Sequence, residues 1–172
     1  MQLFYSDQII ESTSSYTFPR EESKHIVRVL RKRIDDIIYI TNGQGYLFTS
    51  HIIDENPNKC TVAIQKSLYH KPIPYYLHMA VAPTKLNDRF EWFLEKATEI
   101  GVSEITPILC EHSERKSIKI DRYQKILKSA LKQSLQYHLP KLNELTHIHE
   151  FFEQTASSLS TKCIAHCEGD II

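Results

Sequence analysis

Cationic and hydroxyl side chains gather where two apolar runs of the sequence end. Lys85 follows the run that ends at Ala82, and the run that ends at Cys110 leads into four further polar residues, His112, Ser113, Arg115 and Lys116. In open α/β sheets, ligands bind in the crevice at the carboxyl ends of the strands. If both runs are parallel strands, these side chains meet at one edge of the sheet and would bind an anion there. The alternative is that they only solvate the surface.

Basic residues are concentrated in two segments of a chain whose net charge is zero. Residues 20–33 contain six lysine or arginine residues against Glu21 and Glu22, and residues 112–141 contain eight against Glu114 and Asp121. Two separated basic segments on a neutral protein indicate a polyanion contacted at two places. The alternative, that each segment only solvates a helix face, stays open.

Composition is that of an ordinary folded protein of 172 residues, with 41% hydrophobic and 24% charged residues. The sequence contains no secretory signal pattern and no apolar run of membrane-spanning length, so we expect a cytoplasmic protein without a membrane partner. The cysteines are expected to be reduced thiols in that compartment. A zinc site at Cys163, His166 and Cys167 lacks a fourth ligand at a usual spacing, so no metal is expected.

Residues 1–70 are predicted to form a small β-barrel. Residues 37–40 and 46–53 are β-branched and aromatic runs separated by Asn42-Gly43, which is a strong hairpin signal. Residues 60–64 offer another strand, and residues 23–30 are expected to form a short helix. Pro72 and Pro74 disfavour both helix and central strand, so the domain boundary is placed here.

Residues 71–172 are predicted to form an incomplete α/β domain with parallel strands, which makes the chain a two-domain α+β protein. Strands are expected at 76–82 and 105–110, separated by a helix that Asp88 caps at its start and Gly101 follows at its end. Further helices are expected from Asp121 to Pro140 and over 146–156, with a third strand at 162–167. A parallel sheet needs cover on both faces, so a chain that stops five residues later is expected to be a fragment.

Several segments resemble one family. They are EKATEIGVSEITPILCEHSERK (Glu95–Lys116) with Lys85 and Glu91, AlaxxGlnSer (Ala130–Ser134) with Pro140, HIVRVLR (His25–Arg31) and NGQG (Asn42–Gly45). In order and spacing they resemble the bacterial rRNA methyltransferases that act on N3 of a uridine in 16S rRNA. The resemblance implies a PUA-like barrel for RNA, a SPOUT-class domain with a C-terminal knot, S-adenosylmethionine as methyl donor and a homodimer. It also implies small-subunit rRNA, or the ribosomal subunit, as partner.

The sequence departs from that family at several places. The glycine-rich GPEGG segment of the knot is absent, an arginine common before Ser113 is His112, an arginine common after the Gln-Ser pair is Gln136, and Gln2 and Leu3 replace an early arginine. The cofactor is therefore expected to be held only in a full-length protein, and this chain alone is expected to be inactive. The alternative function is a non-catalytic RNA-binding module. An unrelated nucleotide-binding enzyme is disfavoured, because no phosphate-cradling glycine loop follows any strand.

The predicted RNA-binding residues are therefore His25, Arg28, Arg31, Lys85, His112, Ser113, Arg115, Lys116 and Gln133. The arginines suit bidentate phosphate contact, whereas His25 has packing against the barrel as its alternative, and Gln133 has helix packing. No catalytic residue is assigned, and Glu111 is only a candidate base. We expect Arg28 and Arg31 to face the same side of the molecule as Lys85 and Arg115.

Overall fold

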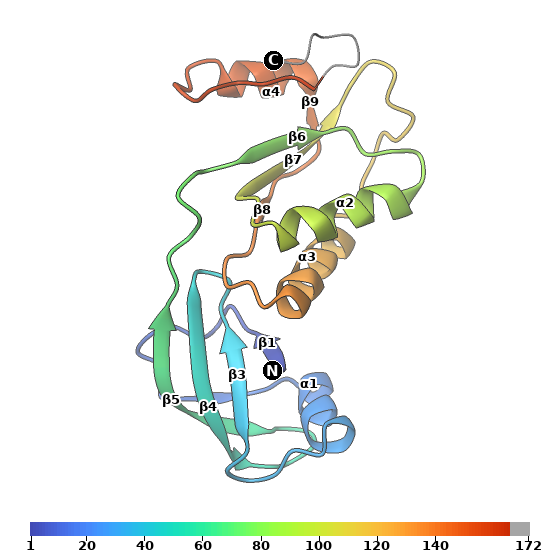
Figure 1. The fold of residues 1–172 in the computed structure, drawn as a ribbon. Coiled ribbons are helices and arrows are strands. Elements are labelled where there is room, and N and C mark those ends of the chain that lie inside the picture. Colours follow the sequence, from blue (N-terminus) through green and yellow to red (C-terminus); the bar gives the residue numbers. More distant parts are fainter. Residues whose placement is uncertain (166–172) are drawn as a thin grey trace.

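A computed structural model of the chain describes residues 1–165 as two lobes that follow one another along a long axis (Figure 1). The amino-terminal lobe is a curled β-sheet with a short helix, and the carboxyl-terminal lobe is a parallel sheet with helices. None of the helices in the described residues is long and apolar enough to cross a membrane. The predicted two-domain α+β fold is confirmed.

The curled sheet has the strand order β1-β3-β4-β5-β2. Its strands are β1 (Leu3–Tyr5), β2 (Ser15–Thr17), β3 (Ile37–Thr41), β4 (Tyr46–Asp54) and β5 (Thr61–Tyr69). β1 pairs in parallel with β3, and the other pairs are antiparallel. The predicted β3–β4 hairpin is confirmed, with Ile40 opposite Phe48. Both side chains are fully buried, because alternate residues of each strand point into the lobe's core.

A helical segment, α1 (Arg20–Lys24) followed by the π-helical turn η1 (His25–Val29), closes one end of this sheet. It begins three residues earlier than predicted, directly after Pro19, so Ser23 lies inside the helix and its hydroxyl is used inside the lobe. Ser23 Oγ donates to the Phe18 carbonyl over 3.0 Å and accepts the Cys60 N–H over 2.9 Å. This contact fixes the helix against the curled sheet, and Arg28 is exposed.

The second lobe is built around β7, with which every other strand of its sheet runs parallel. Its elements are β6 (His78–Val81), α2 (Asn87–Glu99), β7 (Glu104–Leu109), α3 (Ile120–Ser134), β8 (Lys141–Leu142), β9 (Thr146–His147) and α4 (Ile148–Thr155). Helices α2 and α3 lie on one side of the sheet and α4 on the other (Figure 1). Phe90, Leu94 and Leu127 pack between α2, α3 and the sheet.

The end of α2 forms as predicted, but its start does not. Gly101 has φ +83° and its N–H donates to the Thr98 carbonyl, while the Val102 N–H donates to Ala97, which is a Schellman ending. The predicted capping role of Asp88 is wrong: the helix already begins at Asn87, and no side chain caps it. An acidic residue in the first turn still favours the positive end of the helix dipole.

Two further predictions fail in the same lobe. Asp121 does not cap α3, which begins one residue earlier at Ile120 without a side-chain cap. The third strand is not at 162–167: residues 162–165 are in no strand, and 166–167 lie outside the described residues. Instead β8 and β9 pair with β7, because the chain after Pro140 returns along its open edge.

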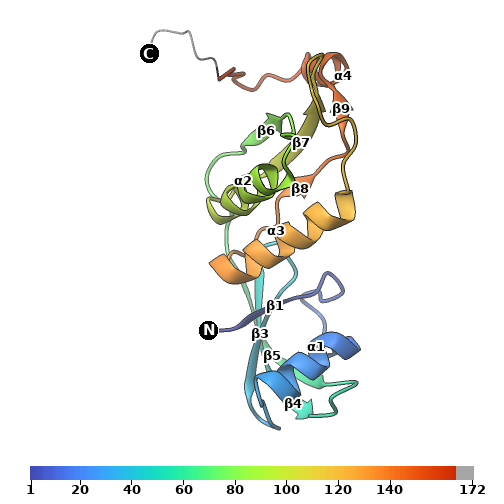
Figure 2. The same ribbon diagram turned by 90° about the vertical axis from the view of Figure 1, so that its right-hand side faces the viewer.

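The NGQG turn joins the two lobes. The Gly45 N–H donates to the Tyr137 carbonyl, and the Leu139 N–H donates to Gly43, each over 2.8 Å. Gln44 and His138 form an isolated antiparallel bridge between them. In the side view, α3 lies directly above β1 of the curled sheet (Figure 2). The hairpin turn therefore acts as a docking strand for the segment after α3.

A polar network lies at the amino end of β7. The Glu104 carboxylate accepts hydrogen bonds from Tyr76, from Lys141 over 2.8 Å and from Asn143 over 2.6 Å. Burial by itself would raise the pKa of Glu104, but these three hydrogen bonds and the nearby His78 outweigh it and lower the pKa to about 2. The network therefore depends on an ionised carboxylate.

We expect Glu104→Gln to lower the free energy of unfolding at pH 7 by on the order of 2 kcal/mol, because a depressed folded-state pKa stabilises the folded protein once the carboxylate is ionised. This stabilisation is present above pH 4.5, the reference value of the unfolded chain, and is lost as pH falls toward 2. Urea unfolding at pH 7, 4 and 3 measures it. If the free energy of unfolding of Glu104→Gln and that of the parent change with pH in the same way, the role given to Glu104 is wrong.

Candidate functional site

The loops after β6 and β7 meet at one edge of the parallel sheet. The guanidinium of Arg115 donates from Nε to the Thr84 carbonyl over 3.0 Å and from Nη2 to the Lys85 carbonyl over 2.6 Å. Lys85 Nζ in turn pairs with Glu114 Oε1 at 3.1 Å. Arg115 therefore ties the two loops together through main-chain oxygens, so the position of Lys85 depends on it.

A shallow cavity of about 650 Å³ lies between these loops. It is lined by Ala82, Pro83, Thr84, Lys85, Leu86, Arg89, Cys110, His112, Ser113 and Glu114. Ser113 Oγ accepts the Cys110 N–H over 2.9 Å, so this hydroxyl shapes the turn after β7. The Lys85 and Glu114 side chains are 74% and 58% exposed, so water screens their ion pair, and an anionic ligand can displace the carboxylate at little cost.

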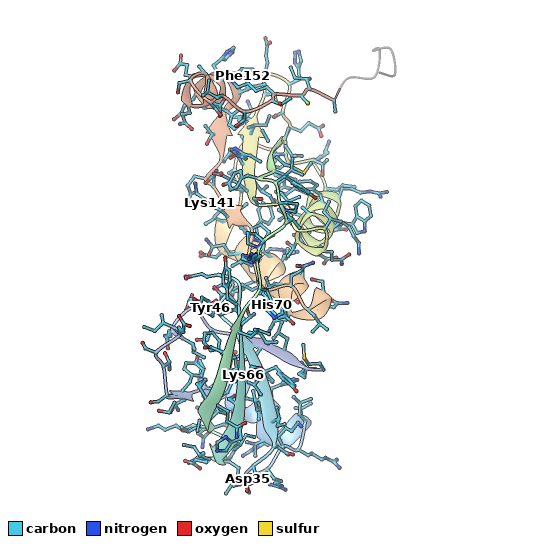
Figure 3. All side chains as sticks on the ribbon, turned by 60° about the vertical axis from the view of Figure 1, so that its left-hand side comes forward. Asp35, Tyr46, Lys66, His70, Lys141 and Phe152 are labelled. Atoms are coloured by element: carbon cyan, nitrogen blue, oxygen red, sulfur yellow. The ribbon has the colours of Figure 1, made fainter. Side chains whose placement is uncertain are left out.

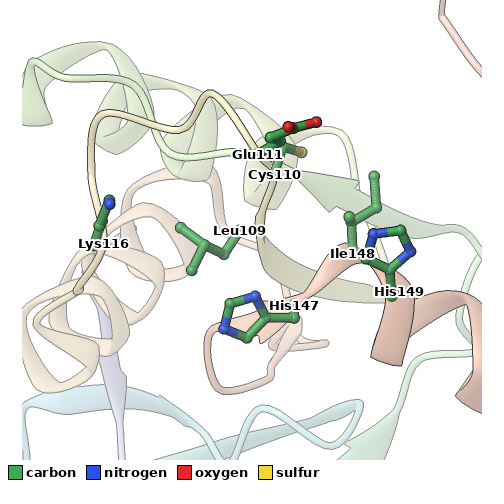
Figure 4. A pocket seen from close by; sticks show the side chains of 7 residues that line it. All are labelled: Leu109, Cys110, Glu111, Lys116, His147, Ile148 and His149. Atoms are coloured by element: carbon green, nitrogen blue, oxygen red, sulfur yellow. The ribbon is translucent and has the colours of Figure 1, made fainter.

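Lys116 lies in a second cavity, of about 660 Å³, that shares Cys110 with the first. Its other lining residues are Leu109, Glu111, His147, Ile148 and His149. Figure 4 shows Lys116 and His149 on opposite sides, with Leu109 and His147 between them. Neither histidine was predicted from the sequence as a site residue, because both reach this edge only through the pairing of β9 with the end of β7. The THIH alternation before α4 was the available signal.

The predicted site residues divide into two groups. Lys85, His112 and Ser113 line the first cavity, Arg115 is hydrogen-bonded to the Lys85 carbonyl, and Lys116 lines the neighbouring cavity. The other four predicted residues lie elsewhere in the structure: His25, Arg28, Arg31 and Gln133. The first group forms one candidate anion-binding edge.

Three of the predicted RNA-binding residues lie in the amino-terminal lobe. Arg28 belongs to η1, Arg31 follows it with φ +54°, and both are exposed. His25 is half-buried, with its ring 6.3 Å from that of Phe4 in an edge-on packing. Helix α1 and the loops after β6 and β7 lie toward the same side of the long axis, on the right in Figure 1. A polyanion that touches both groups must therefore span both lobes.

The predicted and observed site residues also differ at Gln133 and Arg89. Gln133 is exposed on α3 and lines neither of the two cavities. Arg89, which is not among the residues predicted from the sequence, lines the first cavity from the start of α2. Within residues 1–165, no group of three or more histidine, cysteine or acidic side chains is placed to hold a metal ion. The zinc set considered from the sequence includes His166 and Cys167, which lie outside the described residues.

Known proteins match both lobes. The family described as "RNA methyltransferase domain" matches residues 71–171, and "RNA methyltransferase PUA domain" matches residues 18–65. The chain is 28% identical over 169 residues to "Ribosomal RNA small subunit methyltransferase E" of Buchnera aphidicola subsp. Acyrthosiphon pisum, covering 94% of this chain and 66% of the relative. The chain therefore spans just under two thirds of that relative's length.

Solved structures agree with this match. A probable rRNA-methyltransferase from Porphyromonas gingivalis superposes with a TM-score of 0.79 at 36% identity, covering 94% of this chain and 65% of that one. The small subunit methyltransferase E of Neisseria gonorrhoeae, solved with S-adenosyl methionine, has a TM-score of 0.81 at 23% identity and covers 91% of this chain and 66% of that one. At that identity the second likeness concerns the fold alone. Since the methyltransferase match extends over the α/β lobe, the chain belongs to the RNA methyltransferase family.

Proposed function

We propose that the protein acts as an S-adenosylmethionine-dependent methyltransferase on N3 of a uridine in small-subunit 16S rRNA. The family match supports RNA methylation, and the names of the relatives support ribosomal RNA as the substrate. The observation that carries the proposal is the meeting of Lys85 and Arg115 at the carboxyl edge of the parallel sheet, where α/β proteins bind ligands. N3 specificity rests on the sequence resemblance.

Methyl transfer to N3 places three demands on a protein. The base must leave its pair, because N3 lies on the Watson–Crick edge. The methyl group must lie in line with N3, and the N3 proton must leave. The cationic edge supports the first demand by holding the phosphates on either side of the target nucleotide. Glu111, which lines the second cavity, is a candidate base that could accept the N3 proton, and it is not assigned as catalytic.

The cofactor supplies the methyl group when bound, but the described residues do not by themselves fit it. Close approach of a backbone to a nucleoside usually requires glycine. The glycines with positive φ within residues 1–165 are Gly43, Gly45 and Gly101, which lie at the joint between the lobes and at the end of α2. No cofactor contact is therefore assigned to residues 1–165.

The two lobes are proposed to divide the work. Residues 1–70 would hold RNA through the curled sheet and the arginines of η1, and residues 71–172 would present the nucleotide at the sheet edge. The partner would be small-subunit rRNA or the ribosomal subunit in the cytoplasm, and the full-length protein would act as a homodimer. The alternative is a non-catalytic RNA-binding module. The exposed arginines of the amino-terminal lobe would be sufficient to bind RNA in that case.

A methyl-transfer assay separates these functions. We expect a full-length form to transfer tritiated methyl groups to small-subunit rRNA, with a reverse-transcription stop that marks N3, since methylation there blocks pairing. The prediction that the 172 residues alone do not transfer methyl groups is tested in the same assay. Equal activity of the two proteins would refute that prediction, and activity of neither would favour the binding module.

Salt dependence tests the phosphate contacts. We expect the affinity of the chain for its RNA to fall about 10- to 100-fold between 50 and 200 mM salt, because each cation on a phosphate releases counterions. Arg28→Ala and Arg31→Ala should each reduce the slope of log affinity against log salt by about one. Filter binding measures both quantities. A flat salt response of the parent chain would exclude phosphate-dominated binding.

A further inference from the structure

Exposed tyrosines line the segment that connects the two lobes. Tyr69 is 49% exposed, Tyr75 is 59% exposed and Tyr76 is 68% exposed. Three exposed rings within eight residues form a cluster rather than scattered single residues, and such clusters mark interaction sites. Neither the proposed reaction nor the packing of the lobes uses Tyr75 or Tyr76 as core residues.

Tyr76 is exposed but held in place. Its hydroxyl donates to the Glu104 carboxylate, which Lys141 and Asn143 hold from the other side. The hydrogen bond to this carboxylate raises the pKa of Tyr76 to about 12, so the phenol stays protonated and remains a donor. A ring that is fixed at its hydroxyl and open on its face loses little conformational entropy when a flat ligand stacks on it.

A cavity of about 580 Å³ opens beside these rings. Besides Tyr75 and Tyr76, its walls include Lys71, Pro72, Gln136 and His138. Lys71 is exposed and forms no ion pair with any residue of the described chain. A free cation next to flat aromatic surfaces is the combination that proteins use to bind single-stranded nucleic acid.

The cavity belongs to a longer strip of polar and aromatic residues. Figure 3 shows Lys66, Tyr46, His70 and Lys141 following one another from the curled sheet to the α/β lobe. The cavity lies at the amino ends of β6 and β7, opposite the edge that carries Lys85. It therefore offers a contact separate from that edge.

We propose that Tyr75, Tyr76 and Lys71 bind an unpaired nucleotide of single-stranded RNA, with the base stacked on the tyrosine rings and the phosphate on the lysine. This inference rests on the proposed function, since it takes RNA as the substrate. The site is sequence-tolerant, because every base has a flat face to stack. It anchors a strand that flanks the target nucleotide and adds to the hold of the two basic groups.

An oligonucleotide that carries 2-aminopurine tests the stacking, because its fluorescence falls when the base stacks. We expect Tyr76→Ala and Tyr75→Ala each to weaken binding by the 172-residue chain about 10-fold and to remove most of the quenching. Tyr75→Ala guards against misfolding, since the Tyr75 side chain forms no hydrogen bond with a described residue. Tyr76→Phe keeps the ring and should cost only two- to threefold.

Trp92→Ala is the matched control, because Trp92 is an aromatic residue 60% exposed on α2 that does not line the cavity beside the tyrosines. Its affinity and quenching should equal those of the parent. If both tyrosine variants bind and quench like the parent while binding stays salt-dependent, the stacking site is wrong and the proposed function stands. If the parent itself binds no RNA, the proposed function fails as well. If the tyrosine variants bind the oligonucleotide like the parent but lose binding to the ribosomal subunit, the strip contacts a protein partner and the RNA site is wrong.

Discussion

Gly45→Ala is expected to lower the free energy of unfolding by about 3–5 kcal/mol, because two costs combine at this position. Gly45 has φ +92°, a region that residues with a side chain rarely adopt. An added Cβ would also lie 2.6 Å from His138 Cε1 and 2.6 Å from Tyr69 Cε2. The His138 ring is held by a 2.8 Å hydrogen bond between its Nε2 and the His70 carbonyl, and the Tyr69 ring packs against the rings of Tyr46 and His138. Chemical denaturation monitored by circular dichroism measures the loss.

Gly101→Ala is the matched control for this prediction. Gly101 has φ +83°, so it shares the backbone cost, but the nearest atom to an added Cβ is Ile73 Cδ1 at 3.6 Å. Its expected cost is therefore only about 1–2 kcal/mol. The difference between the two variants isolates the contact between the lobes. Equal losses would mean that the NGQG turn is not the close joint described above.

Arg115→Ala is expected to weaken RNA binding about 10- to 100-fold. The guanidinium forms the two charge-assisted hydrogen bonds to the Thr84 and Lys85 carbonyls. Such bonds contribute on the order of 1.5–3 kcal/mol each, and every 1.4 kcal/mol is about tenfold in affinity. Partial exposure of Arg115 lowers the effect to the stated range. Loss of both bonds frees the loop that positions Lys85.

Two further variants test whether this loss comes from the hydrogen-bonding geometry of Arg115 or from its charge. Arg115→Lys should recover little, because an ammonium cannot place two donors on both carbonyls in the planar geometry of a guanidinium. Lys125→Ala removes an exposed cation from the outer face of α3 and should change affinity less than twofold. If Arg115→Lys binds RNA like the parent, then Arg115 contributes only charge, and the tie between the loops has no functional weight.

Local sequence patterns predicted the elements that depend on neighbouring residues. The Asn42-Gly43 hairpin, the Gly101 helix ending and the strands β6 and β7 formed where expected. Parallel pairing of β6 with β7 then brought Lys85 and Arg115 to one edge, as the order of the elements implied. The helix starts were less predictable, because Asn87 and Ile120 begin helices that packing against the sheet stabilises without side-chain caps.

The sequence by itself determined the α+β class and the cationic residues that follow β6 and β7, since each depends on periodicity, turn residues and local charge. Only the tertiary structure decided that NGQG docks the lobes, that His147 joins Lys116, and that Glu104 fixes the ring of Tyr76. Those contacts join residues at least 28 positions apart in the chain. Long-range contacts of this kind are set by how the lobes pack and not by the pattern of either segment, so they become visible only in the folded chain.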